Sequence, residues 1–260
     1  MRVYLINLER RKDRLAAMQG QAAGLGLELD LVTALDAGTA DPASVNRWFA
    51  MGGPLGEIPA GDKACLLSHR AAWERFVASG EAHAVFLEDD VRLSQVAGPM
   101  LTTDSWIAAD AEVVKLEHYG PPGQRVLLAD IHAVGEDFRI GRMLSRHTGG
   151  AAYILSRRAA QILLAEQRFD LPVDHLLFNP NNSKLFAALS PWQLVPAIAR
   201  QQEFVGEKSD IEKTRTGLRA FGLAYIRREL VRFGYDLKLV PRQLAELLKG
   251  AKFVAVKTAD

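Results

Sequence analysis

Short apolar segments that alternate with stretches of helical periodicity constrain this chain most strongly. Five segments have the β-branched and aromatic content of buried strands: Arg2–Leu8, Leu27–Leu35, Ala84–Leu87, Val113–Leu116 and Ala151–Leu155. Apolar residues recur at helical spacing between several of them, as in Ala60–Ser79 and Arg157–Gln167. Strands that alternate with helices are typical of a mainly parallel sheet covered by helices on both faces. We therefore expect an α/β fold.

The length and composition fit one such domain. The chain has 260 residues, of which 48% are hydrophobic and 24% charged, so it can bury a large core. It has no run of about 18 apolar residues, and the opening segment Met1–Arg14 lacks the features of a signal peptide. The single cysteine, Cys65, cannot form an internal disulfide. We expect a cytoplasmic protein.

The charge is distributed unevenly, although the net charge is only +1. Residues 213–257 carry 11 Lys and Arg against 3 Asp and Glu, a balance of +8, which leaves −7 for the rest of the chain. The same region has an apolar helical side. We therefore divide the chain into an α/β body at residues 1–205 and a basic, amphipathic helical tail at residues 206–260. Such a tail meets either an anionic partner or only solvent.

Three adjacent carboxylates, Glu88, Asp89 and Asp90, directly follow the strand Ala84–Leu87. They repel one another, and nothing in local folding requires them. A divalent cation such as Mg²⁺ or Mn²⁺ removes this repulsion, because it takes oxygen ligands and bridges carboxylates to a diphosphate. In open α/β sheets, ligands bind beyond the carboxyl ends of strands, where this trio lies. The trio predicts a metal or diphosphate site. An acidic turn that caps the next helix is the alternative.

A further carboxylate, Asp174, stands among apolar residues in the segment Leu171–His175. Held there by Pro172, it is a candidate general base. A role as a helix N-cap explains the same residue, because the apolar segment Leu176–Phe178 follows it.

Two other groups of polar residues are candidates for binding a nucleotide or phosphate. Ser68 and His69 lie within the predicted helix Ala60–Ser79, where a buried structural role explains them equally. Asn7 and the basic residues that follow the first strand, Arg14 among them, would hold a diphosphate or form a solvated face.

Taken together and in order, seven segments of the chain resemble glycosyltransferase family 25, the lipooligosaccharide-type β-galactosyltransferases that also include the collagen galactosyltransferases. The segments are Val3–Arg14, Ala64–Arg70, Ala84–Val91, Val114–Glu117, Thr148–Leu155, Pro172–Asp174 and Gln193–Ala197. Each segment is modest by itself, but their common order is specific. The resemblance implies a GT-A fold, which is a Rossmann-like, mixed and mainly parallel sheet that binds a nucleotide sugar at its switch point. The basic helical tail would be an appendage to it.

The resemblance also implies roles for the candidate residues. Glu88, Asp89 and Asp90 would be the acidic motif that holds Mn²⁺ or Mg²⁺ on the diphosphate of a UDP-sugar donor. The residues that line the nucleotide would be Ile6, Asn7, Arg14, Ser68, His69 and Asp89. Family members invert the anomeric centre, so a carboxylate must deprotonate the acceptor hydroxyl opposite the leaving group. Asp174 is our candidate for this catalytic base.

Two departures from the family pattern bear on specificity. Lys63 stands where the family has an apolar residue, which would change the charge beside the expected donor pocket. The segment His175–Asn182, which follows the candidate base, is individual and leaves the acceptor open.

The sequence therefore predicts an inverting hexosyltransferase that uses a metal ion to assist the departure of UDP. It would move galactose, or as second choice glucose, from a UDP-sugar to a lipopolysaccharide-type or other surface-glycan acceptor. Bacterial members of the family use lipid-linked acceptors, so the basic tail would hold the enzyme loosely at the inner face of the cytoplasmic membrane.

Three alternatives make different predictions. A transferase that has lost metal dependence through Lys63 would be insensitive to chelators. A non-catalytic module of the same fold would bind a nucleotide sugar or a glycan without turnover. A nucleic-acid binder needs aromatic residues among its basic ones and a basic body, both of which are missing here, so we expect no nucleic-acid partner.

Overall fold

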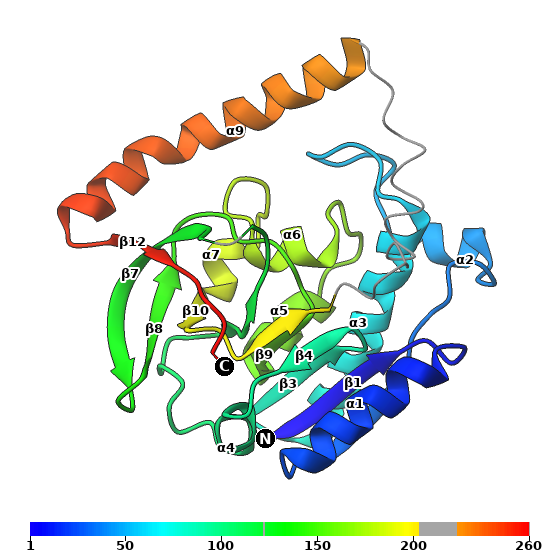
Figure 1. Ribbon diagram of the computed structural model, residues 1–260. Helices are drawn as coiled ribbons and strands as arrows, with labels where there is room; N and C mark the ends of the chain where they lie inside the picture. Colours follow the sequence, from blue (N-terminus) through cyan, green and yellow to red (C-terminus); the bar gives the residue numbers. More distant parts are fainter. Residues whose placement is uncertain (122, 203–222, 260) are drawn as a thin grey trace.

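A large mixed sheet with helices on both faces forms the body of the protein (Figure 1). The computed structural model describes residues 1–121, 123–202 and 223–259. Within these ranges the large sheet has nine strands, and a smaller sheet has three. The α/β fold expected from the sequence, with a large mixed sheet covered by helices on both faces, is confirmed.

The nine strands of the large sheet are, in spatial order, β12 (Lys252–Ala255), β7 (Arg125–Val134), β8 (Phe138–Met143), β10 (Pro191–Val195), β5 (Val113–Lys115), β9 (Ala152–Ser156), β3 (His83–Glu88), β1 (Arg2–Asn7) and β2 (Leu29–Thr33). Three pairings are parallel: β1 with β2, β1 with β3, and β5 with β10. The other five are antiparallel. Only β8, β9 and β12 run against the rest, so the sheet is mixed with most of its described strands in one direction.

The helices are α1 (Lys12–Gly24), α2 (Pro42–Asn46), α3 (Ala60–Ser79), α4 (Ala97–Thr102), α5 (Arg157–Leu164), α6 (Val173–Phe178), α7 (Phe186–Leu189) and α9 (Leu223–Leu248). The small sheet consists of β4 (Val91–Leu93), β11 (Ala199–Gln201) and β6 (Glu117–His118). Helix α3 has the bounds that its periodicity predicts.

Alternation along β1 explains why helices cover both faces of the sheet. Tyr4 and Ile6 belong to the apolar cluster that contains the buried aromatic residues of α3. Val3 and Leu5 belong to the opposite cluster, which contains the buried side chains of α1. Successive side chains of a strand point to opposite faces, so a strand that is apolar throughout must be covered on both sides.

Helix α3 connects the parallel strands β2 and β3, and this connection positions the candidate site. A helix that links two parallel strands runs back along the sheet, so its first half lies near the carboxyl end of the strand that follows. Cys65, Ser68 and His69 lie in this first half, and Glu88 is the last residue of β3.

The C-terminal region contains the expected helix, but the chain then returns to the sheet. Helix α9 extends along the outside of the body (Figure 1), whereas the predicted helical residues 213–222 lie outside the described ranges. Strand β12 then pairs antiparallel with β7, and Val256 after it is buried. In the described part of the tail, α9 is therefore a helical appendage, whereas the strand β12 that follows it belongs to the sheet of the body. None of the described helices is long and apolar enough to cross a membrane.

We expect Val256→Ala to destabilise the protein by about 2 kcal/mol, because it removes two buried methyl groups and leaves a cavity. Phe253→Ala is the matched control, since this larger side chain is 53% exposed, and its effect should stay within about 0.5 kcal/mol. Urea unfolding measures both. Equal small effects would show that the C-terminal strand is not docked.

Candidate functional site

The acidic trio at the end of β3 does not act as one group, because each carboxylate has different partners. Asp89 is buried and bound through both of its oxygens. Asn7 Nδ2 donates to Asp89 Oδ2 at 2.8 Å, and Arg14 Nη1 donates to Asp89 Oδ1 at 2.9 Å. Asn7 and Arg14 thus lie at the predicted site, where they hold Asp89 in place. The alternative that Arg14 lies on a solvated face is wrong.

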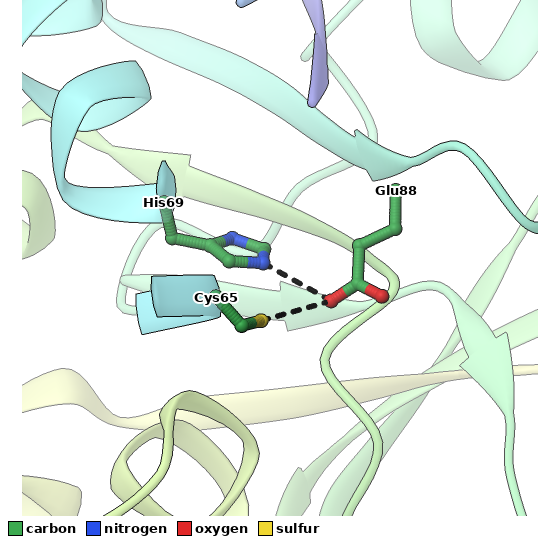
Figure 2. Close-up of side chains that lie close together, drawn as sticks. All are labelled: Cys65, His69 and Glu88. Carbon is green, nitrogen blue, oxygen red and sulfur yellow. Dashed lines mark hydrogen bonds and ion pairs between the residues drawn. The ribbon is translucent and has the colours of Figure 1, made fainter. Parts of the chain in front are cut away.

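Glu88 is turned toward α3 instead (Figure 2). Its Oε1 atom lies 3.1 Å from His69 Nε2 and 3.7 Å from Cys65 Sγ. Figure 2 shows that the second carboxylate oxygen, Oε2, points away from both of these residues. Burial, and next the charge of Glu88, raises the pKa of the Cys65 thiol well above its usual range. A protonated thiol at this position donates its weak hydrogen bond to the carboxylate.

Asp90 has the least compensated charge of the three. Its Oδ2 atom lies 3.7 Å from Arg14 Nη1, and its buried Oδ1 atom has no hydrogen-bond partner among the described residues. Burial, followed by the charges of Glu88 and Asp89, raises the pKa of Asp90 to about 8. The next element is the strand β4, so the alternative that the trio caps a helix is wrong.

His69 is fully buried and part of a hydrogen-bonded chain of side chains. Its Nδ1 atom lies 2.7 Å from the hydroxyl oxygen of Tyr153, and Trp73 Nε1 donates to the same oxygen at 2.9 Å. The His69 and Tyr153 rings are stacked, with centroids 5.6 Å apart. His69 therefore reaches the site through its contact with Glu88.

A buried ion pair fixes the loop beside the trio. Lys115 Nζ donates to Glu117 Oε1 at 2.7 Å and to the carbonyl oxygen of Gly149, and it lies over the ring of Phe178. Glu117 Oε1 also accepts from the backbone N–H of Ala151. Gly149 has a φ of +95°, and a Cβ there would lie 2.9 Å from Glu117 Oε1. Only glycine fits this turn.

Asp174 lies in the first turn of α6, next to this loop. A Cβ at Gly150 would be 3.6 Å from the Cα and Cβ atoms of Asp174. The N-cap of α6 is Pro172, so the alternative that Asp174 is the cap is wrong. The charge of Asp174 also contributes to the raised pKa of Cys65, after burial, Glu88 and Asp62. Asp174 is thus close to the Glu88 side of the site.

Three other residues that the sequence analysis singled out have structural contacts. The side chain of Ile6 is buried in the core beside β3, where Ile6 pairs with Glu88. Ser68 donates to the carbonyl oxygen of Ala64 and accepts from the backbone N–H of Leu35, so its hydroxyl ties α3 to the end of β2. Lys63 Nζ donates to Asn46 Oδ1 of α2 at 2.8 Å.

Two kinds of metal ligand meet at Glu88. The ligand atoms of Cys65, His69 and Glu88 lie within 4.8 Å of one another and could hold an ion, but thiol and imidazole groups suit softer metals than Mg²⁺ or Mn²⁺. For a hard cation, the suitable oxygens are Glu88 Oε2 and Asp90 Oδ1, which is buried with no hydrogen bond in the described structure. Each oxygen of Asp89 already accepts a hydrogen bond, from Asn7 or from Arg14.

Several residues of the site were missed in the sequence analysis. The alternation of Lys115 and Glu117 within an apolar segment is a signal that could have found the buried pair. His147 and Gln193 could not be found from spacing, because they meet only in the fold, where His147 Nδ1 donates to Gln193 Oε1 at 2.7 Å. Burial, followed by the charge of Lys115, lowers the pKa of His147 to about 3, so this side chain is neutral.

Comparison with known proteins gives a family and several relatives. The model of glycosyltransferase family 25, described as an LPS biosynthesis protein, matches residues 1–177. A glycosyltransferase 25 family member of Anopheles gambiae is 28% identical over 243 residues, which are 84% of this chain and 39% of the relative. The lacto-N-neotetraose biosynthesis glycosyltransferase LgtB of Neisseria gonorrhoeae is 32% identical over 155 residues, which are 54% of this chain and 53% of the relative.

The chain thus spans less than two thirds of the length of either relative. Among solved structures, a glycosyltransferase involved in the glycosylation of the major capsid of PBCV-1 is similar over 83% of this chain and 98% of its own, at 10% identity and a TM-score of 0.40.

The different environments of Asp90 and Asp89 predict opposite effects on stability in the absence of divalent cations. The pKa of Asp90 is raised from 3.8 to about 8, so the folded state binds more protons than the unfolded state between these values. Stability therefore falls as the pH rises through this window. Asp90→Asn should make this fall smaller and raise the Tm at pH 8.

Asp89→Asn is the matched comparison, because it removes the charge that pairs with Arg14. We expect it to destabilise the protein by roughly 3 kcal/mol and to lower the Tm at both pH 5 and pH 8. Thermal unfolding of the two variants in EDTA measures the difference. A stabilising Asp89→Asn or a destabilising Asp90→Asn at pH 8 would contradict this account of the trio.

Proposed function

The chain belongs to glycosyltransferase family 25, and we propose that it is an inverting hexosyltransferase that uses a UDP-sugar donor. Galactose is the first choice for the sugar and glucose the second. The acceptor is a lipopolysaccharide, a lipooligosaccharide or another surface glycan. The observation that carries this proposal is the division of the acidic trio, in which Asp89 is held by protein groups while Glu88 and Asp90 each keep one carboxylate oxygen for a ligand.

The donor end of the proposed site is the carboxyl end of β3. Glu88 and Asp90 would hold Mn²⁺ or Mg²⁺, which when bound supplies Lewis-acid stabilisation of the departing diphosphate. Arg14, fixed by Asp89, adds a positive charge beside Asp90. Asn7 keeps Asp89 in place through its side-chain amide.

The acceptor end is the loop at Gly150 and the start of α6. Asp174 would accept the proton of the acceptor hydroxyl as the oxygen attacks the anomeric carbon from the face opposite UDP. The buried ammonium group of Lys115 lies close enough to interact with the charge of Asp174.

A lipid-linked acceptor would be reached from a membrane surface, and α9 has the pattern for such contact. Leu237, Val240, Leu244 and Leu248 are exposed and recur at helical spacing. The opposite side of α9 faces the body, where Gln243 Nε2 donates to the carbonyl oxygen of Leu144.

The helix also carries exposed cations away from this apolar stripe. Lys238 and Arg242 are exposed on α9, and Lys249 directly follows it. A helix with an apolar stripe and separate cations is typical of helices that lie in the interface of an anionic membrane. This pattern supports our proposal that the enzyme acts at the inner face of the cytoplasmic membrane.

Donor binding tests the metal-dependent half of the proposal. We expect one UDP-hexose to raise the Tm in the presence of Mn²⁺ and not in EDTA, since a ligand at about a hundred times its Kd stabilises the folded state by about 2.7 kcal/mol. Glu88→Gln and Asp90→Ala should abolish the shift, whereas Asp30→Asn, an exposed carboxylate on β2, should leave it unchanged. A shift that survives EDTA would contradict metal dependence.

Asp174→Asn separates catalysis from binding. Loss of a general base lowers kcat by about 10²–10⁴-fold, while the donor-induced shift in Tm should stay as in the wild type. Transfer of radiolabelled sugar to a panel of deacylated lipooligosaccharide acceptors measures the rate. Donor binding by a wild-type protein that transfers to none of these acceptors and does not hydrolyse the donor would instead support a non-catalytic binding module.

Membrane contact is tested with vesicles. We expect the wild type to sediment with vesicles that contain anionic phosphatidylglycerol and much less with phosphatidylcholine alone. The double variant Leu244→Ser/Leu248→Ser should bind about tenfold more weakly, because it removes apolar surface from the interface. Leu31→Ser, an exposed apolar position on the opposite edge strand β2, is the matched control. Equal binding by all three proteins would rule out this face of α9.

A further inference from the structure

Four side chains form a continuous hydrogen-bonded chain beneath the acidic site. Trp73 Nε1 and Tyr153 Oη are 2.9 Å apart, Tyr153 Oη and His69 Nδ1 are 2.7 Å apart, and His69 Nε2 and Glu88 Oε1 are 3.1 Å apart. Trp73, Tyr153 and His69 are fully buried, so water does not supply alternative partners to them. The proposed catalytic roles use only the last member, Glu88.

The chemistry of these groups fixes which atom is the donor and which the acceptor in each of these hydrogen bonds. An indole N–H can only donate, so Trp73 donates to the oxygen of Tyr153. The one hydroxyl hydrogen of Tyr153 needs an acceptor, and its remaining neighbour in this chain is His69 Nδ1. Nδ1 must then carry a lone pair, which leaves the imidazole proton on Nε2. That proton is donated to Glu88 Oε1.

We propose that Tyr153 is a positioning residue that holds His69 in the Nε2–H tautomer, so that His69 fixes Glu88 Oε1 and the other oxygen of Glu88 is presented to the cation of the donor. This inference rests on the proposed function of Glu88. The thiol of Cys65 lies 3.7 Å from the same Oε1 atom and supports the same orientation.

The rings that surround Tyr153 make the arrangement rigid. Tyr153 stacks on Phe86 with centroids 5.2 Å apart, and Phe178 packs against it edge-on. Phe86 lies on β3, two residues before Glu88, and Tyr153 lies opposite Phe86 on the neighbouring strand β9, so one sheet carries both Tyr153 and Glu88. A long Glu side chain has several rotamers, and a buried partner on one oxygen selects one of them in advance of binding.

The tautomer of His69 in the wild-type protein is the direct test. Nitrogen-15 NMR of protein labelled in its 6 histidines distinguishes a protonated from an unprotonated ring nitrogen, and His69→Asn assigns the signals. The proposal predicts a protonated Nε2 and an unprotonated Nδ1 at neutral pH. An Nδ1–H tautomer or a doubly protonated ring would overturn it without any mutation of Tyr153.

Tyr153→Phe removes only the hydroxyl group that determines which ring nitrogen of His69 carries the proton. We expect the His69 signals to change toward a mixture of tautomers, and the Mn²⁺ affinity measured with UDP to fall about tenfold, as for other groups that orient a metal ligand. The KM for the donor should rise with it, whereas kcat at saturating Mn²⁺ and donor should change much less, because Asp174 is untouched.

Tyr4→Phe is the matched control, since Tyr4 is a buried tyrosine that stacks on the other side of the same aromatic cluster, on Phe86. It should change neither the His69 signals nor the Mn²⁺ affinity. A Tyr153→Phe protein with altered His69 signals but wild-type Mn²⁺ affinity would overturn the link to Glu88. Wild-type Mn²⁺ affinity in Glu88→Gln would instead overturn the proposed function of Glu88, and the tautomer result would still stand.

Discussion

Three adjacent carboxylates at the end of a buried strand are the constraint on which the rest of the site depends. Three like charges at this position destabilise the fold unless each is compensated. The protein compensates Asp89 completely with Asn7 and Arg14, and Glu88 on one oxygen only. Asp90 keeps a buried oxygen without a hydrogen bond in the described structure. The missing compensation is therefore concentrated where a divalent cation would supply it.

Much of the fold could be predicted from the sequence, because it follows from local patterns. The β-branched and aromatic content of β1 and the helical spacing in α3 depend on neighbouring residues only, and both elements have the expected character. The return of β12 to the sheet could not be predicted, because its pairing with β7 joins residues more than a hundred positions apart. A short segment such as Lys252–Ala255 carries no signal for its partner strand.

The residues that meet at the end of β3 could be singled out from the sequence, but their contacts could not. The density of charge at Glu88, Asp89 and Asp90 was visible in the sequence, and Asn7 and Arg14 were candidates for binding a diphosphate. The sequence could not show that Asp89 is the carboxylate held by these two residues. That outcome depends on the parallel register of β1 and β3, which brings the end of one strand beside the end of the other. His69 bonds to Tyr153 and Glu88, whereas the neighbouring Ser68 bonds to backbone groups of Leu35 and Ala64. These different partners likewise follow from the orientation of α3 relative to the sheet.

The most direct measurement of the central claim is the anomalous diffraction of manganese in crystals grown with UDP and Mn²⁺. The account predicts a manganese peak at ligand distance, about 2.1 Å, from one oxygen each of Glu88 and Asp90. Asp89 should still be bound to Asn7 and Arg14. A peak coordinated by Asp89, or one seated between Cys65 and His69, would contradict the division of the trio from which the proposed function is derived.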